Sequence, residues 1–307
     1  GEDVLHIFRM ALYELYEAKT PPHAAVDGAV SLTVPKQKGL VNAVLRNIGR
    51  DDVVWEDLAN PQAKWLRKRL VKAWGEDAVG VMEQVFSATP PLDLTVKDDA
   101  ETWAKTLEGE VLPTGSVRMA RVPRVTGLPG FDDGAWWVQD AAAAMPVQVL
   151  APTDGMRVLD LCAAPGGKTM QLAASGAQVT AVDNSAPRMK RLADNLARVN
   201  LSAQVLTTDA LRLKGSYNAI VLDAPCSATG TIRRHPDLPH AKDGSEFGTL
   251  IGLQSDLIDH AWTLLKPGGR MVFCTCSLLP DEGEVQVDEA LERHSDMTVD
   301  SAALDLP

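Results

Sequence analysis

Two cysteines in the last third of the chain have neighbours suited to covalent chemistry. Cys226 closes the stretch Asp223-Ala-Pro-Cys226, and Cys276 lies within Thr275-Cys-Ser277. A thiolate can add to C6 of a pyrimidine ring, which makes the poorly nucleophilic C5 atom able to attack the methyl group of a sulfonium. This chemistry needs one thiol near the methyl group and an acidic or hydrogen-bonding partner for the ring. Two thiols at adjacent strand ends, with Asp223 between them, meet that requirement.

The other two cysteines are predicted to have different surroundings. Cys274 shares a strand face with Cys276 because side chains two apart on a strand point the same way. It lies deeper in the strand, and we expect it in the core. Cys274-x-Cys276 lacks the spacing and the second pair of a zinc site, so no metal is predicted. Nothing indicates a secretory disulfide framework, which favours a reduced, cytoplasmic protein.

The stretch Val158 to Thr169 predicts a ligand-binding turn. Its apolar start is typical of a buried parallel strand, Pro165-Gly166-Gly167 breaks the strand, and a helix is expected from Lys168 to Ser175. A strand, a glycine turn and a helix place free backbone N–H groups at the carboxyl edge of a sheet. The spacing is neither the dinucleotide Gly-x-Gly-x-x-Gly nor a P-loop. Alone, the turn is equally well explained as an ordinary connection between a strand and a helix.

Two carboxylates favour a nucleoside ligand at this edge. Asp183 follows the next predicted strand about twenty residues after the turn, where a carboxylate can accept both ribose hydroxyls. Asp209 follows the third strand, where it can accept from an adenine amino group. Together with the turn they indicate S-adenosylmethionine rather than NAD. For each aspartate alone, a helix N-cap is the simpler alternative.

These residues are positioned by an alternation of strands and helices that begins near Met156 and predicts a parallel sheet. An acidic residue or a cysteine lies at or just past the end of most strands, which core packing does not explain. The first predicted strand ends at Asp160, and the other four span 178–182, 204–207, 219–222 and 270–275. Helices are predicted over 188–199 and 250–265.

The first half of the chain is predicted to be mostly helical. Helices are expected within residues 1–50, at about 24–32 and at 40–48, and again within 53–90. Trp65 and Trp74 are interleaved with a group of basic residues, which suits phosphate contact and base stacking in RNA. The basic residues are Lys64, Arg67, Lys68, Arg69 and Lys72. Tryptophans facing the core beside solvated charges are the alternative, and we favour it for the tryptophans. Beyond Pro90-Pro91, a small α+β segment is expected, with strands at 92–96 and 117–125 and a helix at 100–107. An Ala-rich helix ending near Leu150 follows.

Composition limits the function classes. The chain has 307 residues and a net charge of −11, which does not favour nucleic-acid binding on average, although a basic stripe can lie on an acidic protein. The charged and apolar fractions are those of a globular protein. No signal peptide or membrane-spanning run is evident, so we expect neither secretion nor a membrane partner.

Several motifs together resemble those of the RNA cytosine-C5 methyltransferases. The similarity lies in Asp160-Leu-Cys-Ala-Ala-Pro-Gly-Gly-Lys-Thr169, Asp223 to Gly230, Arg233-Arg-His-Pro-Asp237 and Thr275-Cys-Ser277. Residues 1–50, with Pro21-Pro22-His23-Ala24 and Lys38 to Arg46, resemble the NusB-like domain of the RsmB (Sun, Fmu) branch. Leu128 to Gly134 and Val138-Gln-Asp140 also resemble that branch, so the similarity covers nearly the whole chain.

The resemblance implies a role for each matching residue. Cys276 would attack C6, Cys226 would assist breakdown of the adduct, and Asp223 would hold the cytosine, with Lys168 also in the catalytic set. S-adenosylmethionine is the implied methyl donor, and small-subunit 16S ribosomal RNA is the implied partner. The loop Gly230–Pro236 would approach RNA through Arg233, Arg234 and His235. The implied cofactor-binding residues are Cys162, Ala163, Ala164, Pro165, Gly166, Gly167, Lys168, Asp183, Arg188, Asp209 and Asp223.

The resemblance also implies three domains in a monomer. They are a NusB-like helical RNA-binding domain over 1–52, a helical and small α+β linker domain over 53–150, and a Rossmann-like α/β methyltransferase domain over 151–307. Relative to the family pattern, we expect the first helices and the last strands to be missing, which puts the activity of this polypeptide in question. A tRNA methyltransferase with the same chemistry and a non-catalytic RNA-binding or assembly factor are the alternative functions. The NusB-like start argues against the first, and the intact Cys226 and Cys276 argue against the second.

Overall fold

In a computed structural model, residues 2–49, 62–121 and 124–301 of the chain are described. The chain forms two compact units, residues 1–60 and 61–307. Within the described ranges, no helix combines the length and the apolarity needed to cross a membrane. Part of the helical stretch predicted within 53–90, up to residue 61, lies outside the described residues.

The described part of the first unit, residues 2–49, contains three α-helices, as predicted: α1 (Glu2–Tyr16), α2 (Pro22–Leu32) and α3 (Lys38–Ile48). Proline is tolerated in the first turn of α2 because the N–H that it lacks has no partner within a helix at that position. One apolar stripe from each helix faces the others. The buried residues of this small core are Val4, Ala11, Ala29, Val41 and Leu45.

The second unit begins with two helices and a small antiparallel sheet. The helices are α4 (Lys64–Trp74) and α5 (Glu76–Ser87), and the sheet has the order β2-β3-β1-β4. Its elements are β1 (Leu92–Val96), α6 (Ala100–Thr106), β2 (Glu110–Val111), β3 (Val117–Met119) and β4 (Trp136–Val138). The strand predicted over 117–125 is shorter than expected, because its partner Leu92 opposite Met119 is the first residue of β1. Beyond Met119, β1 offers no further partner.

The predicted parallel sheet is confirmed, with the strand order β7-β6-β5-β8-β9. In this order β5 lies between β6 and β8. All neighbouring strands are parallel, so their carboxyl ends meet at one edge of the sheet. The elements are α7 (Ala141–Leu150), β5 (Arg157–Leu161), α8 (Gly167–Ala174), β6 (Gln178–Asp183), α9 (Ala186–Arg198), β7 (Gln204–Thr207), β8 (Tyr217–Asp223), α10 (Leu238–Ala241), α11 (Phe247–Leu264), β9 (Leu265–Cys274) and α12 (Glu284–Arg293).

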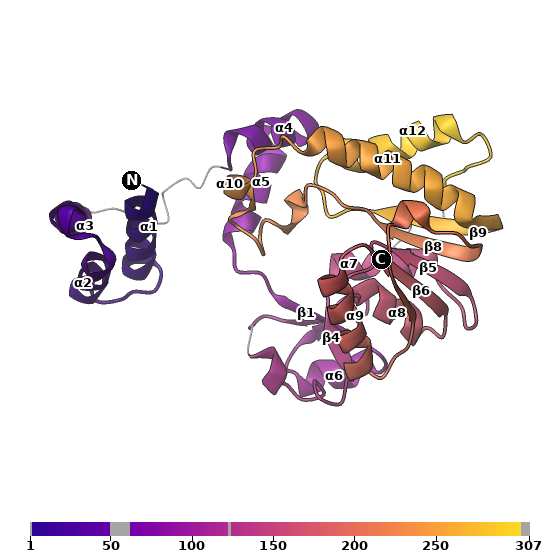
Figure 1. Cartoon of the computed structure of the whole chain (residues 1–307). Coiled ribbons are helices and arrows are strands. Elements are labelled where there is room, and N and C mark those ends of the chain that lie inside the picture. The colour runs from indigo at the N-terminus through magenta and orange to yellow at the C-terminus, as the bar shows by residue number, and fades with distance from the viewer. Residues whose placement is uncertain (1, 50–61, 122–123, 302–307) are drawn as a thin grey trace. The chain divides into compact units, whose positions relative to one another are not determined.

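Helices cover both faces of this sheet (Figure 1). Leu159 and Ile220 pack with Leu257 of α11, on the face that α11 and α12 cover. Val158 directly precedes Leu159 in β5, so its side chain points to the opposite face of the sheet, where it packs with α7 and α8. The strands are buried on both faces, which explains their nearly continuous apolar sequences.

Helices α4 and α5 belong to the same compact unit as the large sheet. Trp74 Nε1 donates a 2.6 Å hydrogen bond to Leu278 O, and Trp65 Nε1 donates a 2.9 Å bond to Pro239 O. Trp65 also packs edge-on against Phe247, whereas the Trp74 side chain is 44% exposed. The described part of the predicted linker, up to residue 150, therefore packs with 151–307 in one compact unit.

Candidate active site

The predicted ligand-binding turn follows β5 directly. Cys162 has a left-handed backbone with φ +61°, and Gly166 has φ +107° just before α8. A Cβ on Gly166 would lie 2.9 Å from Leu192 Cγ, so glycine is required by both conformation and space. Burial raises the pKa of the Cys162 thiol to about 12, which makes this thiol inert. Cys162 therefore contributes its backbone geometry to the turn rather than a reactive sulfur.

Asp183 ends β6 beside this turn and is almost fully buried. Its carboxylate accepts hydrogen bonds from Ala164 N at 3.3 Å and Ser185 N at 2.9 Å. Arg188 Nη1 lies 3.6 Å from Asp183 Oδ2, and the same guanidinium donates to Ala164 O. An ionised carboxylate has about four acceptor positions, so the two backbone N–H groups do not by themselves use all of them.

Lys168 connects the turn to the end of β8. Its Nζ lies 2.8 Å from Asp223 Oδ2, and its side chain is mostly buried. Burial by itself lowers the pKa of an ammonium group, but the charge and hydrogen bond of Asp223, together with other nearby acidic groups, outweigh it and hold the pKa of Lys168 above its ordinary value. Lys168 is therefore a cation, and it fixes one oxygen of Asp223.

The two predicted reactive thiols meet at this edge. Cys226 Sγ lies 3.4 Å from Cys276 Sγ, although the residues are 50 positions apart in the chain. The hydrogen bond from Cys226 lowers the pKa of the Cys276 thiol, and Cys276 is the exposed member of the pair. The same contact, together with burial, raises the pKa of Cys226. The pair therefore consists of one thiol disposed to ionise and one that keeps its proton.

Comparison with known proteins identifies the family. The family model described as 16S rRNA methyltransferase RsmB/F matches residues 147–305, and the NusB family model matches 1–50. The chain belongs to the RsmB/F methyltransferase family. It is 38% identical to the ribosomal RNA small subunit methyltransferase B of Erwinia tasmaniensis, over 95% of this chain and 74% of that protein. The same identity holds for the protein of that name from Cronobacter sakazakii, over 96% and 75%.

A solved structure agrees with this assignment. A methyltransferase homologue from Pyrococcus horikoshii is 27% identical, with a TM-score of 0.65 over 76% of this chain and 83% of that one. The predicted Rossmann-like methyltransferase fold and the NusB-like start are therefore confirmed.

The cofactor of this RsmB/F methyltransferase is S-adenosylmethionine. The residues of the chain fit that ligand in kind, because Asp183 places a carboxylate, an acceptor for hydroxyl groups, at the end of β6 beside the turn. Its contact with the ribose stays a prediction. Asp209, after β7, is half-exposed and caps a short helical turn through Leu211 N at 3.0 Å. The N-cap alternative is thus realised for Asp209, and its predicted adenine contact stays a prediction.

Cys274 differs in part from expectation. It packs at the edge of the core, as predicted, and burial raises the pKa of its thiol. Its Sγ also lies 3.7 Å from Asp223 Oδ1, the oxygen that Lys168 does not hold. Asp223 is therefore contacted on both oxygens, and the sequence analysis missed this second contact.

The predicted RNA-contacting arginines have partners within the chain. Arg233 donates to Ala88 O at 3.1 Å and to Thr89 O at 2.9 Å. Arg234 Nη2 lies 2.7 Å from Asp140 Oδ2, at the start of α7. His235 is exposed on the same loop. Both guanidinium groups therefore hold the loop 230–236 to the segments before β1 and α7, and the RNA role of these three residues stays a prediction.

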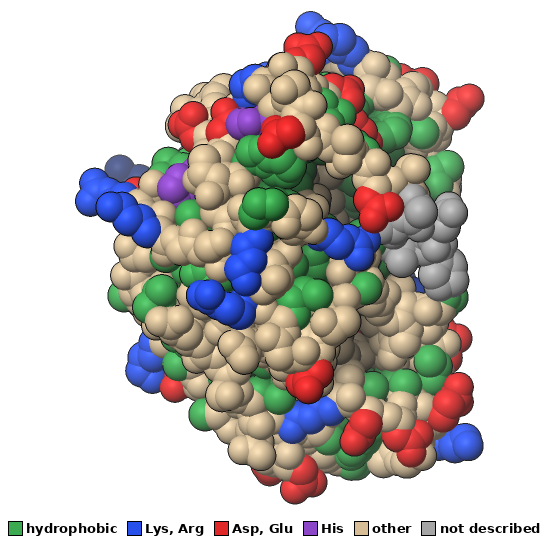
Figure 2. All heavy atoms as spheres, turned by 90° about the vertical axis from the view of Figure 1, so that its right-hand side faces the viewer, with side chains coloured by type: hydrophobic (Ala, Val, Ile, Leu, Met, Phe, Trp, Pro, Cys, Tyr) green, Lys and Arg blue, Asp and Glu red, His purple; other side chains and the backbone are tan. Residues whose placement is uncertain are grey.

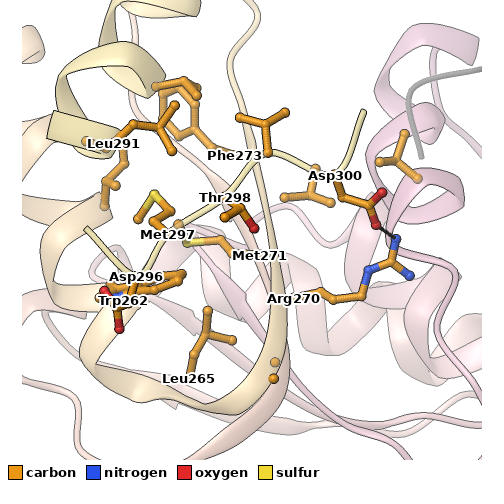
Figure 3. A pocket seen from close by; sticks show the side chains of 18 of the residues that line it. Trp262, Leu265, Arg270, Met271, Phe273, Leu291, Asp296, Met297, Thr298 and Asp300 are labelled. Carbon is orange, nitrogen blue, oxygen red and sulfur yellow. Dashed lines mark hydrogen bonds and ion pairs between the residues drawn. The ribbon is translucent and has the colours of Figure 1, made fainter. Parts of the chain in front are cut away.

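A cavity of about 1180 Å³ lies away from the thiols, along β9 and α12 (Figure 3). Met271, Phe273, Leu291 and Met297 point into it, and Arg270 pairs with Asp300 at 2.9 Å at its rim. Its lining includes none of the candidate catalytic or cofactor-binding residues. The candidate active site therefore lies at the carboxyl ends of the strands and not in this cavity.

Proposed function

We propose that this methyltransferase methylates C5 of a cytosine in 16S ribosomal RNA through a covalent bond between Cys276 and C6. The carrying observation is the thiol pair: Cys276 Sγ is exposed, with a lowered pKa, 3.4 Å from Cys226 Sγ. An exposed thiolate at the carboxyl edge of a methyltransferase sheet is the nucleophile that C5 methylation requires.

The proposed reaction balances in two stages. The Cys276 thiolate forms the S–C6 bond, and the electron pair of the C5–C6 double bond becomes available at C5. C5 then takes the methyl group that S-adenosylmethionine supplies, and the thioether of S-adenosylhomocysteine leaves. Loss of the C5 proton to a base restores the double bond as the S–C6 bond breaks and the thiolate returns. Cys226, at sulfur contact distance, is proposed to assist this second stage.

Asp223 and Lys168 are proposed to act on the cytosine ring. Asp223 lies at the end of β8, with Lys168 at 2.8 Å and Cys274 at 3.7 Å on its two oxygens. Its side chain remains 37% exposed, so acceptor positions remain open toward a base. An oriented carboxylate there can accept from the exocyclic amino group of cytosine, the hydrogen-bond donor that distinguishes cytosine from uracil.

The RNA substrate is proposed from the relatives. The matching family model and the curated relatives are described as methyltransferases of 16S or small-subunit ribosomal RNA. The NusB family match over 1–50 supports an RNA partner for the first unit. Exposed lysines on α4 offer phosphate contacts despite the net charge of −11.

The two thiols can be distinguished by one experiment with substitutions. Cys276→Ala should be inactive and form no covalent complex, because the S–C6 bond cannot form. Cys226→Ala should accumulate a protein–RNA adduct that survives denaturing electrophoresis and requires S-adenosylmethionine. The double variant, which lacks both thiols, serves as the control and should give no adduct. Activity in Cys276→Ala would rule out Cys276 as the nucleophile, and an adduct in that variant would exchange the two roles.

The substrate class needs its own measurement. Purified 16S ribosomal RNA, a transfer RNA pool and an unrelated RNA of similar length are each incubated with protein and S-adenosylmethionine. Bisulfite sequencing then locates 5-methylcytosine. A single modified cytosine in 16S RNA is expected. Modification restricted to transfer RNA would replace the proposed substrate while leaving the chemistry in place.

A further inference from the structure

A buried carboxylate outside the predicted site lies behind the thiol pair. Glu282 is fully buried in the short helical turn that follows the Cys276 loop. Its Oε1 accepts from Ser227 N at 2.9 Å and from Gln254 Nε2 at 3.1 Å. Its Oε2 accepts from Ser227 Oγ. A buried carboxylate is costly unless it is hydrogen-bonded, so these three uncharged donors indicate a site built around it.

The donors connect Glu282 to the loops of both thiols. Ser227 directly follows Cys226, and it supplies two of the three bonds. On the other side, Thr275 Oγ1 donates to the backbone oxygen of Glu282 at 3.1 Å, and Thr275 directly precedes Cys276. Glu282 therefore bonds to the immediate neighbours of both cysteines without contacting either sulfur in a described hydrogen bond.

A chain of hydroxyl groups extends this connection. Ser227 Oγ lies 3.3 Å from Ser277 Oγ, which lies 3.2 Å from Thr229 Oγ1. Each hydroxyl has a single proton, and Ser227 uses its proton in the hydrogen bond that it donates to the Glu282 carboxylate. Ser277 must then donate to Ser227, and Thr229 must donate to Ser277.

The direction of this chain agrees with the backbone. Ser277 Oγ accepts from Leu279 N at 3.1 Å, and Thr229 Oγ1 accepts from Leu278 N at 2.9 Å. Every hydroxyl in the chain can thus donate once and accept at least once. Hydrogen bonds in such a chain polarise one another, so the acceptor at its end orders the whole chain.

The two loops also approach each other closely at the backbone. Gly230 N donates to Cys276 O at 2.8 Å, and a Cβ on Gly230 would lie 2.9 Å from that oxygen. The Cys226 and Cys276 loops are therefore in contact through the hydroxyl groups of Ser227 and Ser277 and also through their backbones. A small shift of one loop would alter the distance between the two sulfurs.

We infer that Glu282 is a positioning residue: by accepting from Ser227 and ending the chain Thr229–Ser277–Ser227, it holds the two cysteine loops in the register that brings the thiols together. This inference rests on the proposed covalent function for its catalytic consequence. The register itself is a property of the protein alone, and it can be measured without RNA or cofactor.

The test compares Glu282→Gln, Ser227→Ala and the control Glu284→Gln. Glutamine keeps the shape of Glu282 but turns an N–H₂ group toward the chain, whereas Ser227→Ala removes one link and keeps the backbone bond. Glu284 is exposed in the first turn of α12, so its variant makes the same chemical change outside the network. Thermal unfolding identifies which variants fold. If Glu282→Gln does not fold, Ser227→Ala decides.

The first readout is the pH dependence of Cys276 alkylation by iodoacetamide, followed by peptide mass spectrometry on the protein alone. Cys276 depends on the hydrogen bond from Cys226 for its lowered pKa, so a loss of register should move the alkylation midpoint to higher pH. The second readout is kcat, which should fall roughly tenfold to a hundredfold, as expected for a displacement of about 1 Å. The affinity for S-adenosylmethionine should stay at the parent value because Asp183 lies outside the network.

The inference is overturned if the folded variants keep both the parent alkylation midpoint and the parent kcat. This outcome differs from failure of the proposed function. If Cys276→Ala remains active, the covalent chemistry is wrong, yet the alkylation midpoint still reports whether Glu282 orders the thiols.

Discussion

Lys168 Nζ and Asp223 Oδ2 lie 2.8 Å apart and join two segments that carry different parts of the site. Lys168 is in the first turn of α8, after the glycine loop, and Asp223 is the last residue of β8. Because β5 and β8 are neighbours in the sheet, the pair joins the glycine turn, where we propose the cofactor, to the strand end beside the thiols. It is a charged pair that burial alone would disfavour, so its removal should be measurable in both stability and activity.

A double-mutant cycle should detect the coupling between Lys168 and Asp223. Lys168→Met and Asp223→Asn should each lower the free energy of unfolding by about 1–2 kcal/mol, less than a fully buried pair because Asp223 is partly exposed. The double variant should lose about 1 kcal/mol less than the sum, because neither charge is then left without its partner. Urea denaturation measures all four proteins. Strict additivity would mean that the ion pair contributes nothing to stability.

Removing the Asp183 carboxylate should weaken cofactor binding. Asp183→Ala loses a buried, charge-assisted acceptor, which should cost about 1.5–3 kcal/mol, or roughly ten- to hundredfold in affinity for S-adenosylmethionine. Isothermal titration calorimetry measures the change directly. Asp194→Ala removes an exposed carboxylate from α9 and should bind like the parent. Equal affinity in Asp183→Ala and the parent would take Asp183 out of the cofactor site.

Asp160 should make stability fall as the pH rises. Its carboxyl is buried in β5 and accepts from Thr169 Oγ1 at 2.5 Å, and burial raises its pKa from 3.8 to about 7. Well below pH 3.8, the folded and unfolded states both hold the proton. Between there and pH 7 only the unfolded state ionises, so ionisation increasingly favours the unfolded chain.

The difference between the parent and Asp160→Asn isolates this effect. From pH 5 to pH 8, the parent should lose up to about 3 kcal/mol of unfolding free energy relative to the variant, in which the group does not titrate. Urea denaturation at several pH values measures it, with the exposed Asp154→Asn as the control. Parallel pH profiles for the parent and Asp160→Asn would show that Asp160 is ionised in the folded protein.

The basic residues of α4 should separate into RNA contacts and structural partners. Arg67 pairs with Glu76 and Glu83, and the Arg69 guanidinium lies 4.6 Å from the centre of the Phe247 ring. The lysines Lys64, Lys68 and Lys72 are exposed at intervals of four residues, which places them in one row on the helix. On the face drawn in Figure 2, acidic and basic side chains are interspersed. A row of lysines would therefore be a local basic feature on an acidic protein.

Replacing these three lysines by alanine should lower the slope of log affinity against log salt for RNA by about 2 units, at about 0.7 for each phosphate that is no longer neutralised. Arg233→Ala should lower that slope by no more than about 0.7, because this residue, which also donates to Ala88 O and Thr89 O, can give up one phosphate contact at most. Lys190→Ala, which removes an exposed charge from α9, is the control. Filter binding at several salt concentrations gives the slopes. If the triple variant keeps the parent slope, the row is only a solvated helix face.

The elements and the edge that carries the chemistry could be predicted from the sequence. The apolar residues Val158, Leu159 and Leu161 and their counterparts in β6 and β8 predict buried parallel strands, because only a sheet covered on both faces needs apolar residues at successive positions. In such a sheet the carboxyl ends meet at one edge, so Asp183, Asp223 and Cys276 could be assigned to one site from their positions after strands. These inferences depend on local periodicity, which a sequence contains directly.

The pairing of particular side chains was decided only by the tertiary structure. The 3.4 Å contact between Cys226 and Cys276 depends on β8 and β9 being neighbours and on how two loops fold back over their strand ends. Arg234 is paired with Asp140, a residue 94 positions away, and no local pattern indicated that contact. Glu282 has no distinguishing local pattern, and its importance follows from burial and from donors supplied by Ser227 and Gln254. Hydrogen bonds and ion pairs act over a few ångströms between residues of any separation, so residue type and spacing do not determine them.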